Sequence, residues 1–101
     1  MAMKSIMQTK RECYFCGDHG DHLHHIFYGS NRQISDKYGC TVWLCWYHHQ
    51  DPQDGIHWTD PNEHEVGKEH DLLLKKRCQA EWEKRYGTRE EFIKTFGRSW
   101  L

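Results

Sequence analysis

Short apolar runs separated by turn residues predict two strands in the first half of the chain. The first covers 22–28 and the second 41–44, by their β-branched and aromatic content. Between them, Ser30 and Gln33 have the spacing of a capping box, and Gly39 marks a stop. A short helical turn or ordered loop is therefore expected between the strands.

Helical signals follow the second strand. A short helix is expected from Cys45 to about Gln50, ended by Asp51-Pro52. A longer one is expected from Pro61 to Gly87, because one row of mostly apolar side chains recurs every four residues. Its members are Val66, His70, Leu74, Cys78, Trp82 and Tyr86, with Leu73 beside them. Thr88 and Glu91 form a second capping-box pattern, which opens a last helix with Phe92, Ile93 and Phe96 on its apolar face.

The elements predict a single α+β domain over residues 1–101. A polar arm covers 1–12, a core covers 13–58, and a helical pair over 61–97 braces it. With 37% hydrophobic and 29% charged residues, such a short chain buries only a modest core. Small domains of this kind usually need a staple, either disulfides or metal.

Cysteine and histidine usage favours metal as the staple. Four of the five cysteines and seven of the nine histidines lie between Cys13 and His57. An odd cysteine count, mixed with histidines and without a secretory leader, is typical of a reducing compartment. No apolar run approaches the length of a membrane span. We therefore expect a cytoplasmic protein that does not enter a membrane.

Two short pairs of ligands predict a structural zinc site. They are Cys13-x2-Cys16 and Cys45-x2-His48, which supply four tetrahedral N/S ligands from separate elements. His19 or His22 could replace His48. The alternative reading makes Cys45 a buried strand-end residue, as expected for Cys40 and Cys78.

The order of these motifs over residues 13–58 resembles the HNH endonucleases, which have the ββα-metal fold. The segments that carry the likeness are a cysteine knuckle, HHI, a strand, LCWYHH and a later histidine. The runs HHIFYGSNR, KYG and VWLCWYHH look closest to phage nucleases of the recombination-enhancement, recombinase-dependent class. The resemblance implies a zinc-stapled ββα core, with a C-terminal helical pair added.

The resemblance also assigns roles by position. His25 corresponds to the general base, and His24, His49 and His57 to the ligands of a catalytic divalent cation. Asn31 would pin the loop at the catalytic site, although the family often places its asparagine where this chain has Cys40. His57 lies eight residues after His49, instead of one helical turn, so Asp51 or Asp54 could complete the site.

The chemistry expected of these residues is hydrolysis of DNA. A neutral histidine can activate water near pH 7, and a cation with open positions stabilises the developing charge. The cation could be Mg²⁺, Mn²⁺, Ni²⁺ or Zn²⁺, and histidine ligands favour the transition metals. Arg32 and Lys37 are candidate phosphate contacts beside the site.

The implied partner is DNA, with single-stranded and recombinase-coated DNA as candidate forms, in the cytoplasm of a host cell if the chain is phage-encoded. The net charge of −1 argues mildly against DNA binding, but bound cations would add positive charge. The alternative is a non-catalytic zinc module that binds DNA or protein, and a weaker one is an RNase. The oligomeric state is left open.

Overall fold

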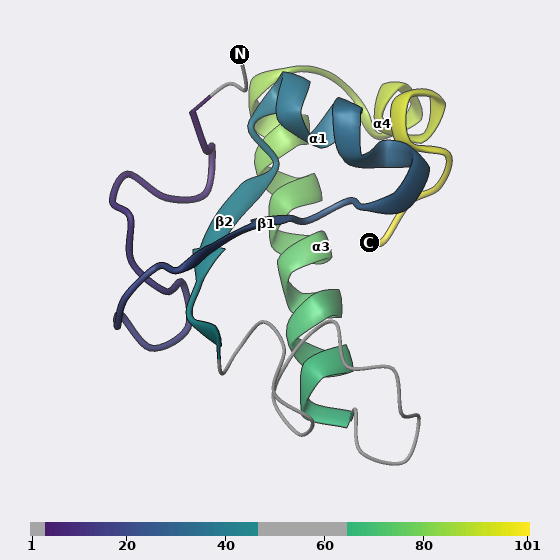
Figure 1. Cartoon of the computed structure of the whole chain (residues 1–101). Coiled ribbons are helices and arrows are strands. Elements are labelled where there is room, and N and C mark those ends of the chain that lie inside the picture. The colour runs from purple at the N-terminus through teal and green to yellow at the C-terminus, as the bar shows by residue number, and fades with distance from the viewer. Residues whose placement is uncertain (1–3, 47–64) are drawn as a thin grey trace.

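The computed structural model of the chain describes residues 4–46 and 65–101 (Figure 1). The described part is a small α+β fold with one two-stranded sheet. Its elements are β1 (His22–His25), the 3-10 helix η1 (Gly29–Asn31), α1 (Arg32–Tyr38), β2 (Thr41–Leu44), α3 (Glu65–Arg85) and α4 (Arg89–Phe96). The short helix expected over 45–50 and the first turn expected at Pro61 fall mostly outside the described residues.

The two strands form an antiparallel hairpin in the expected order, but β1 is shorter than predicted. Its pairing places His24 opposite Val42 and His25 opposite Thr41. Beyond His25 one further bond, from Ile26 N to Cys40 O (2.9 Å), extends the contact before the chain leaves the sheet. Successive side chains alternate between faces, so His24 and Val42 face the core and His25 lies on the other face.

The connection between the strands is η1 followed by α1, and the predicted capping box at Ser30 does not form. Asn31 is the residue that precedes α1, and its side chain makes no capping bond. Gly39 ends α1 in the left-handed conformation (φ 73°), as the sequence predicts. A Cβ on Gly39 would lie 2.2 Å from the carbonyl oxygen of Lys4, so only glycine fits this turn.

The apolar row that the sequence predicts on α3 is buried in its central part. Leu74, Cys78 and Trp82 of α3 are buried, whereas Tyr86 is 36% exposed at the end of the row. The capping box of α4 is confirmed: Thr88 accepts a bond from the Glu91 backbone, and the Glu91 carboxylate accepts one from the Thr88 N–H. This pair fixes the start of α4 directly after the end of α3.

An aromatic cluster joins the helical pair to the hairpin connection. Phe96 lies 4.6 Å from Phe27 and 4.5 Å from Phe92, between ring centroids. Trp82 of α3 meets Phe92 edge to face at 5.4 Å, and Tyr38 of α1 meets Trp82 in the same way at 5.7 Å. The helical pair therefore shares one apolar core with the strands and α1, as Figure 1 shows for α3 behind the sheet.

Residues 4–12, here called the N-terminal arm, lie along β2 instead of forming a loose tail (Figure 1). Ile6 is buried, and its N–H donates to Gly39 O (2.9 Å). The Gln8 side chain accepts a bond from the Trp43 N–H (2.7 Å), and the Ser5 hydroxyl donates to Thr41 O. No periodic pattern marks this segment, because the arm is held by isolated polar bonds and one apolar residue. Within 4–46 and 65–101, no helix is long and apolar enough to cross a membrane.

Candidate functional site

Three cysteines from both sides of the hairpin meet at one point. Cys13 and Cys16 lie in the turn before β1, and Cys45 directly follows β2. Their sulfur atoms all lie within 4.8 Å of one another, and those of Cys16 and Cys45 are 3.9 Å apart. In a tetrahedral zinc site, metal–sulfur bonds of about 2.3 Å place two sulfurs about 3.8 Å apart. All three thiols are free of disulfides, so the group could hold a metal ion such as zinc.

A tight turn directs the first two of these sulfurs to the same side. The N–H of Gly17 donates to Cys13 O, and the N–H of Cys13 donates to Asp18 O, each at 2.8 Å. Gly17 takes a left-handed φ of 73°, which a residue with a side chain rarely adopts. A single β-bridge between Glu12 and His19 closes the base of this turn. The sequence CYFCG therefore forms the knuckle that its spacing predicts.

The surroundings of Cys13 and Cys16 shift the pKa values of the two thiols in opposite directions. Burial acts to raise the pKa of Cys13, but backbone bonds from Cys45, Cys16 and Phe15 outweigh it and lower that pKa below its usual value. At Cys16 a backbone bond from Asp18 favours the thiolate, yet burial and the Cys13 and Cys45 thiols raise its pKa to about 11. Crowded thiolates repel one another, and a bound cation would remove that repulsion.

The fourth ligand predicted for this group, His48, lies outside the described residues. The alternatives His19 and His22 are both described, and neither places a ring nitrogen in the group of sulfurs. His19 is exposed in the turn, where its backbone N–H donates to the Asp18 carboxylate (2.9 Å). Among the described residues the group thus consists of three cysteines.

Of the three histidines predicted to bind the catalytic cation, the structure describes His24. His24 is 1% exposed on the core face of β1, and its ring centroid lies 6.0 Å from that of Tyr28. His49 and His57, with Asp51 and Asp54 as alternatives, lie outside the described residues. Among the described residues, the predicted cation site is therefore represented by the buried imidazole of His24.

His25 is paired with a carboxylate that sequence reasoning missed. Its Nε2 atom lies 2.6 Å from Oδ1 of Asp36, with side chains 12% and 38% exposed. One turn of α1 brings Asp36 back over the end of β1. A signal was present, because Asp36 is the single acidic residue between His25 and Cys45. The helix that carries it was expected only as a turn or loop, so its facing direction could not be derived.

The remaining predicted site residues lie on or beside α1. The Asn31 amide donates to Phe96 O (2.9 Å), which ties the start of α1 to the end of α4. Arg32 is exposed at the first position of α1. Lys37 is also exposed, and its Nζ lies 5.4 Å from the centroid of the Tyr38 ring. Asn31 therefore pins this connection through the C-terminal helix.

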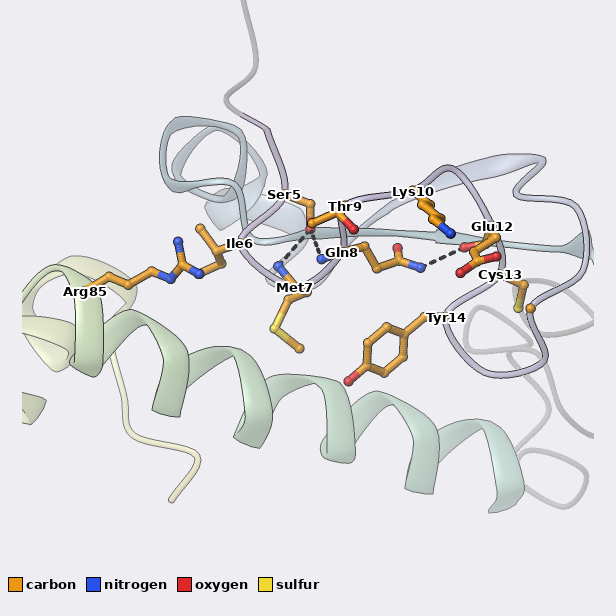
Figure 2. Close-up of a pocket in the computed structure, with 11 residues that line it drawn as sticks. Ser5, Ile6, Met7, Gln8, Thr9, Lys10, Glu12, Cys13, Tyr14 and Arg85 are labelled. Carbon is orange, nitrogen blue, oxygen red and sulfur yellow. Dashed lines mark hydrogen bonds between the residues drawn. The ribbon is translucent and has the colours of Figure 1, made fainter.

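A pocket of about 540 Å³ separates the N-terminal arm from α3 (Figure 2). Met7 and Tyr14 point from the arm side toward α3, with Lys10 and Glu12 at one end and Arg85 at the other. Among its described lining residues, Cys13 is the one predicted metal ligand. The pocket contains neither His24 nor His25, so it is separate from the predicted catalytic residues.

Comparisons of the chain with protein-family models, with curated proteins and with solved structures found no match.

Proposed function

We propose that the chain is a metal-dependent endonuclease that hydrolyses phosphodiester bonds of DNA. The observation that carries the proposal is the contact between His25 and Asp36, at 2.6 Å. A histidine held by a carboxylate and partly open to solvent is the arrangement expected of a general base. It lies on the same short hairpin as the cysteine group, at the position that the HNH resemblance gives to the base.

The contact determines which imidazole nitrogen would do the chemistry. An ionised carboxylate only accepts hydrogen bonds, so Nε2 of His25 carries the hydrogen that Asp36 accepts. The lone pair then lies on Nδ1, which takes a proton from the attacking water. The water oxygen bonds to phosphorus, the bond to the leaving sugar oxygen breaks, and that oxygen gains a proton from solvent. Asp36 keeps the ring oriented and stabilises the imidazolium.

The proposal includes two kinds of metal site. Cys13, Cys16 and Cys45 would hold a structural zinc, with His48 as the fourth ligand. His24, His49 and His57 would hold the catalytic cation, which, when bound, neutralises charge developing on the phosphate. Arg32 and Lys37 carry exposed positive charge on the helix of Asp36, where they can contact the DNA backbone. The cellular role proposed is phage DNA processing or recombination.

A nicking assay on supercoiled plasmid tests the proposal. Wild type and His25→Ala are compared with Mg²⁺, Mn²⁺, Ni²⁺ or Zn²⁺ and with a chelator, after equal metal content and melting temperature have been checked. We expect His25→Ala to nick roughly 100-fold more slowly or worse, the usual loss of a general base. If the wild type gives no more nicked product than His25→Ala with every metal, the endonuclease proposal is lost.

The second candidate function is a non-catalytic zinc module that binds DNA or protein. The burial of His24 favours it, because a histidine that is 1% exposed suits a structural role. Such a module has no use for a base held by a carboxylate. Binding without nicking, unaffected by His25→Ala, would establish this function instead.

A further inference from the structure

A second pocket lies between the N-terminal arm and Trp43 of β2. Its volume is about 460 Å³, within the range of roughly 300–1,000 Å³ that is usual for pockets that hold small ligands. Its lining includes the cations Lys4, Lys10 and Arg11, the polar Gln8 and the indole of Trp43. None of its described lining residues is acidic. We call it the arm pocket.

The Arg11, Trp43 and Gln8 side chains of the arm pocket are held in place before any ligand arrives. The Arg11 guanidinium carbon lies 4.2 Å from the centroid of the Trp43 ring, and Arg11 Nε donates to Gly20 O (3.0 Å). Gln8 is fixed from both ends, accepting from the Trp43 N–H and donating to Glu12 O (2.7 Å each). Preorganised groups lose little freedom when they bind, so these contacts favour affinity.

Trp43, the sheet residue in the described lining of the arm pocket, lies on the sheet face that carries His25. Trp43 is paired with Leu23, and His25 with Thr41, in the same hairpin register. Residues two apart on a strand share a face, so Leu23, Trp43 and His25 lie on one side of the sheet. About 7 Å of strand separates Leu23 from His25. A chain molecule that enters the pocket therefore passes close to the proposed base.

We propose that the arm pocket binds a single nucleic-acid strand and guides it toward His25. Lys4, Lys10 and Arg11 would contact the phosphates, and one base would stack against the Arg11–Trp43 pair. Cationic grooves with aromatic or arginine platforms are the usual recognition surface for single strands. A base inside a duplex is already stacked on its neighbours, so only an unpaired base can enter. The choice of nucleic acid as ligand rests on the proposed endonuclease function.

Binding is measured by fluorescence anisotropy without divalent cations, on a His25→Ala background, so that cleavage plays no part. The probes are a labelled single-stranded DNA, an RNA of the same sequence and a DNA duplex. The test variants are Lys10→Gln/Arg11→Gln and Lys4→Gln/Lys10→Gln; the second leaves the Arg11 contacts intact in case the first misfolds. The control is Lys84→Gln/Lys94→Gln, which removes equal charge from exposed positions on α3 and α4.

We expect the arm variants to weaken single-strand binding about tenfold and to lower the salt dependence by about 0.7 for each lost phosphate contact. The control should change affinity less than about twofold. Photocrosslinks from a halogenated base should map to the arm or Trp43. If RNA binds more tightly than DNA and the variants have the same effects, the result supports the pocket and identifies RNA as its ligand.

Equal weakening by the arm and control variants would overturn the proposal, as would tighter binding of the duplex or crosslinks confined to α3 and α4. The two proposals fail separately. Strand binding at the arm pocket without nicking would remove the endonuclease and leave the pocket. Cleavage of single-stranded substrate that is indifferent to the arm variants would do the reverse.

Discussion

Nε2 of His25 and Oδ1 of Asp36 lie 2.6 Å apart, although 11 residues separate them in the chain. The strand supplies the imidazole and α1 supplies the carboxylate, and Gly39 turns the chain back into β2. The ring is therefore oriented by two packed elements and not by a loop. Such support from rigid elements is what a reactive group needs to hold one geometry.

Asp36→Asn should slow nicking by roughly 10- to 100-fold while leaving KM nearly unchanged, because it disturbs the base and not the binding of DNA. Asp36→Glu should recover part of the rate. The ring nitrogens of His25, followed by ¹⁵N NMR, should show the Nε2–H form in wild type and lose that preference in Asp36→Asn. Glu90→Gln, at an exposed position of α4, is the charge-matched control, and an equal loss there would contradict the positioning role.

Cys13→Ser should unfold the domain, since structural zinc is part of the folding free energy of small metal-stapled domains. Circular dichroism and metal analysis measure the outcome, and we expect at least one tightly held zinc per wild-type chain. Cys40→Ala is the control: Cys40 is buried but outside the sulfur group, so this variant should keep its zinc. A folded, soluble Cys13→Ser protein would refute the structural role.

Tyr28→Phe should make the protein less sensitive to high pH. Partial burial of the residue, which remains 41% exposed, and the nearby Asp71 carboxylate raise the pKa of Tyr28 above its usual value of 10, although Lys75 acts in the opposite direction. A raised pKa means that the neutral phenol is favoured in the fold, so its stability contribution is present below pH 10 and lost above it. Chemical denaturation between about pH 9 and 12 should show a smaller decline for Tyr28→Phe, with Tyr14→Phe as control.

Thr88→Ala should lower the free energy of unfolding by about 1 kcal/mol, the usual cost of losing an N-cap side chain. The variant loses the half of the capping box in which the Thr88 hydroxyl accepts from the Glu91 N–H, and α4 carries Phe92 and Phe96 into the core. Urea denaturation gives the value. Thr9→Ala, at an exposed position outside the helices, should change it by less than about 0.5 kcal/mol.

Local signals predicted the elements that depend on near neighbours. The knuckle at Cys13 and Cys16, the stop at Gly39 and the cap at Thr88 each follow from a few adjacent residues, and all three are confirmed. The false capping box at Ser30 shows the limit of such signals. There the 3-10 helix takes the place of a capped start, and Asn31 bonds instead to α4, 65 residues away.

Long-range contacts that belong to no spacing motif could not be derived from the sequence. To predict the Asp36 contact, one must know which side of α1 faces β1. The contacts of the N-terminal arm are made by polar side chains that show no periodic pattern in the sequence. Trp43, in the strand predicted over 41–44, is half-buried and lines the arm pocket, which its strand pattern does not indicate. The cysteine group was predicted because Cys13-x2-Cys16 and Cys45-x2-His48 each have the spacing of a pair of zinc ligands.

The N-terminal arm also protects the sheet from its own exposed backbone. Strand edges with unpaired N–H and C=O groups are templates for intermolecular pairing. On β2 the Trp43 N–H is bonded by Gln8, its carbonyl by the Tyr14 N–H, and the Thr41 carbonyl by Ser5. Truncation of the first 12 residues would uncover this edge. The shortened protein should then be prone to fibrous aggregation even while its cysteine group stays intact.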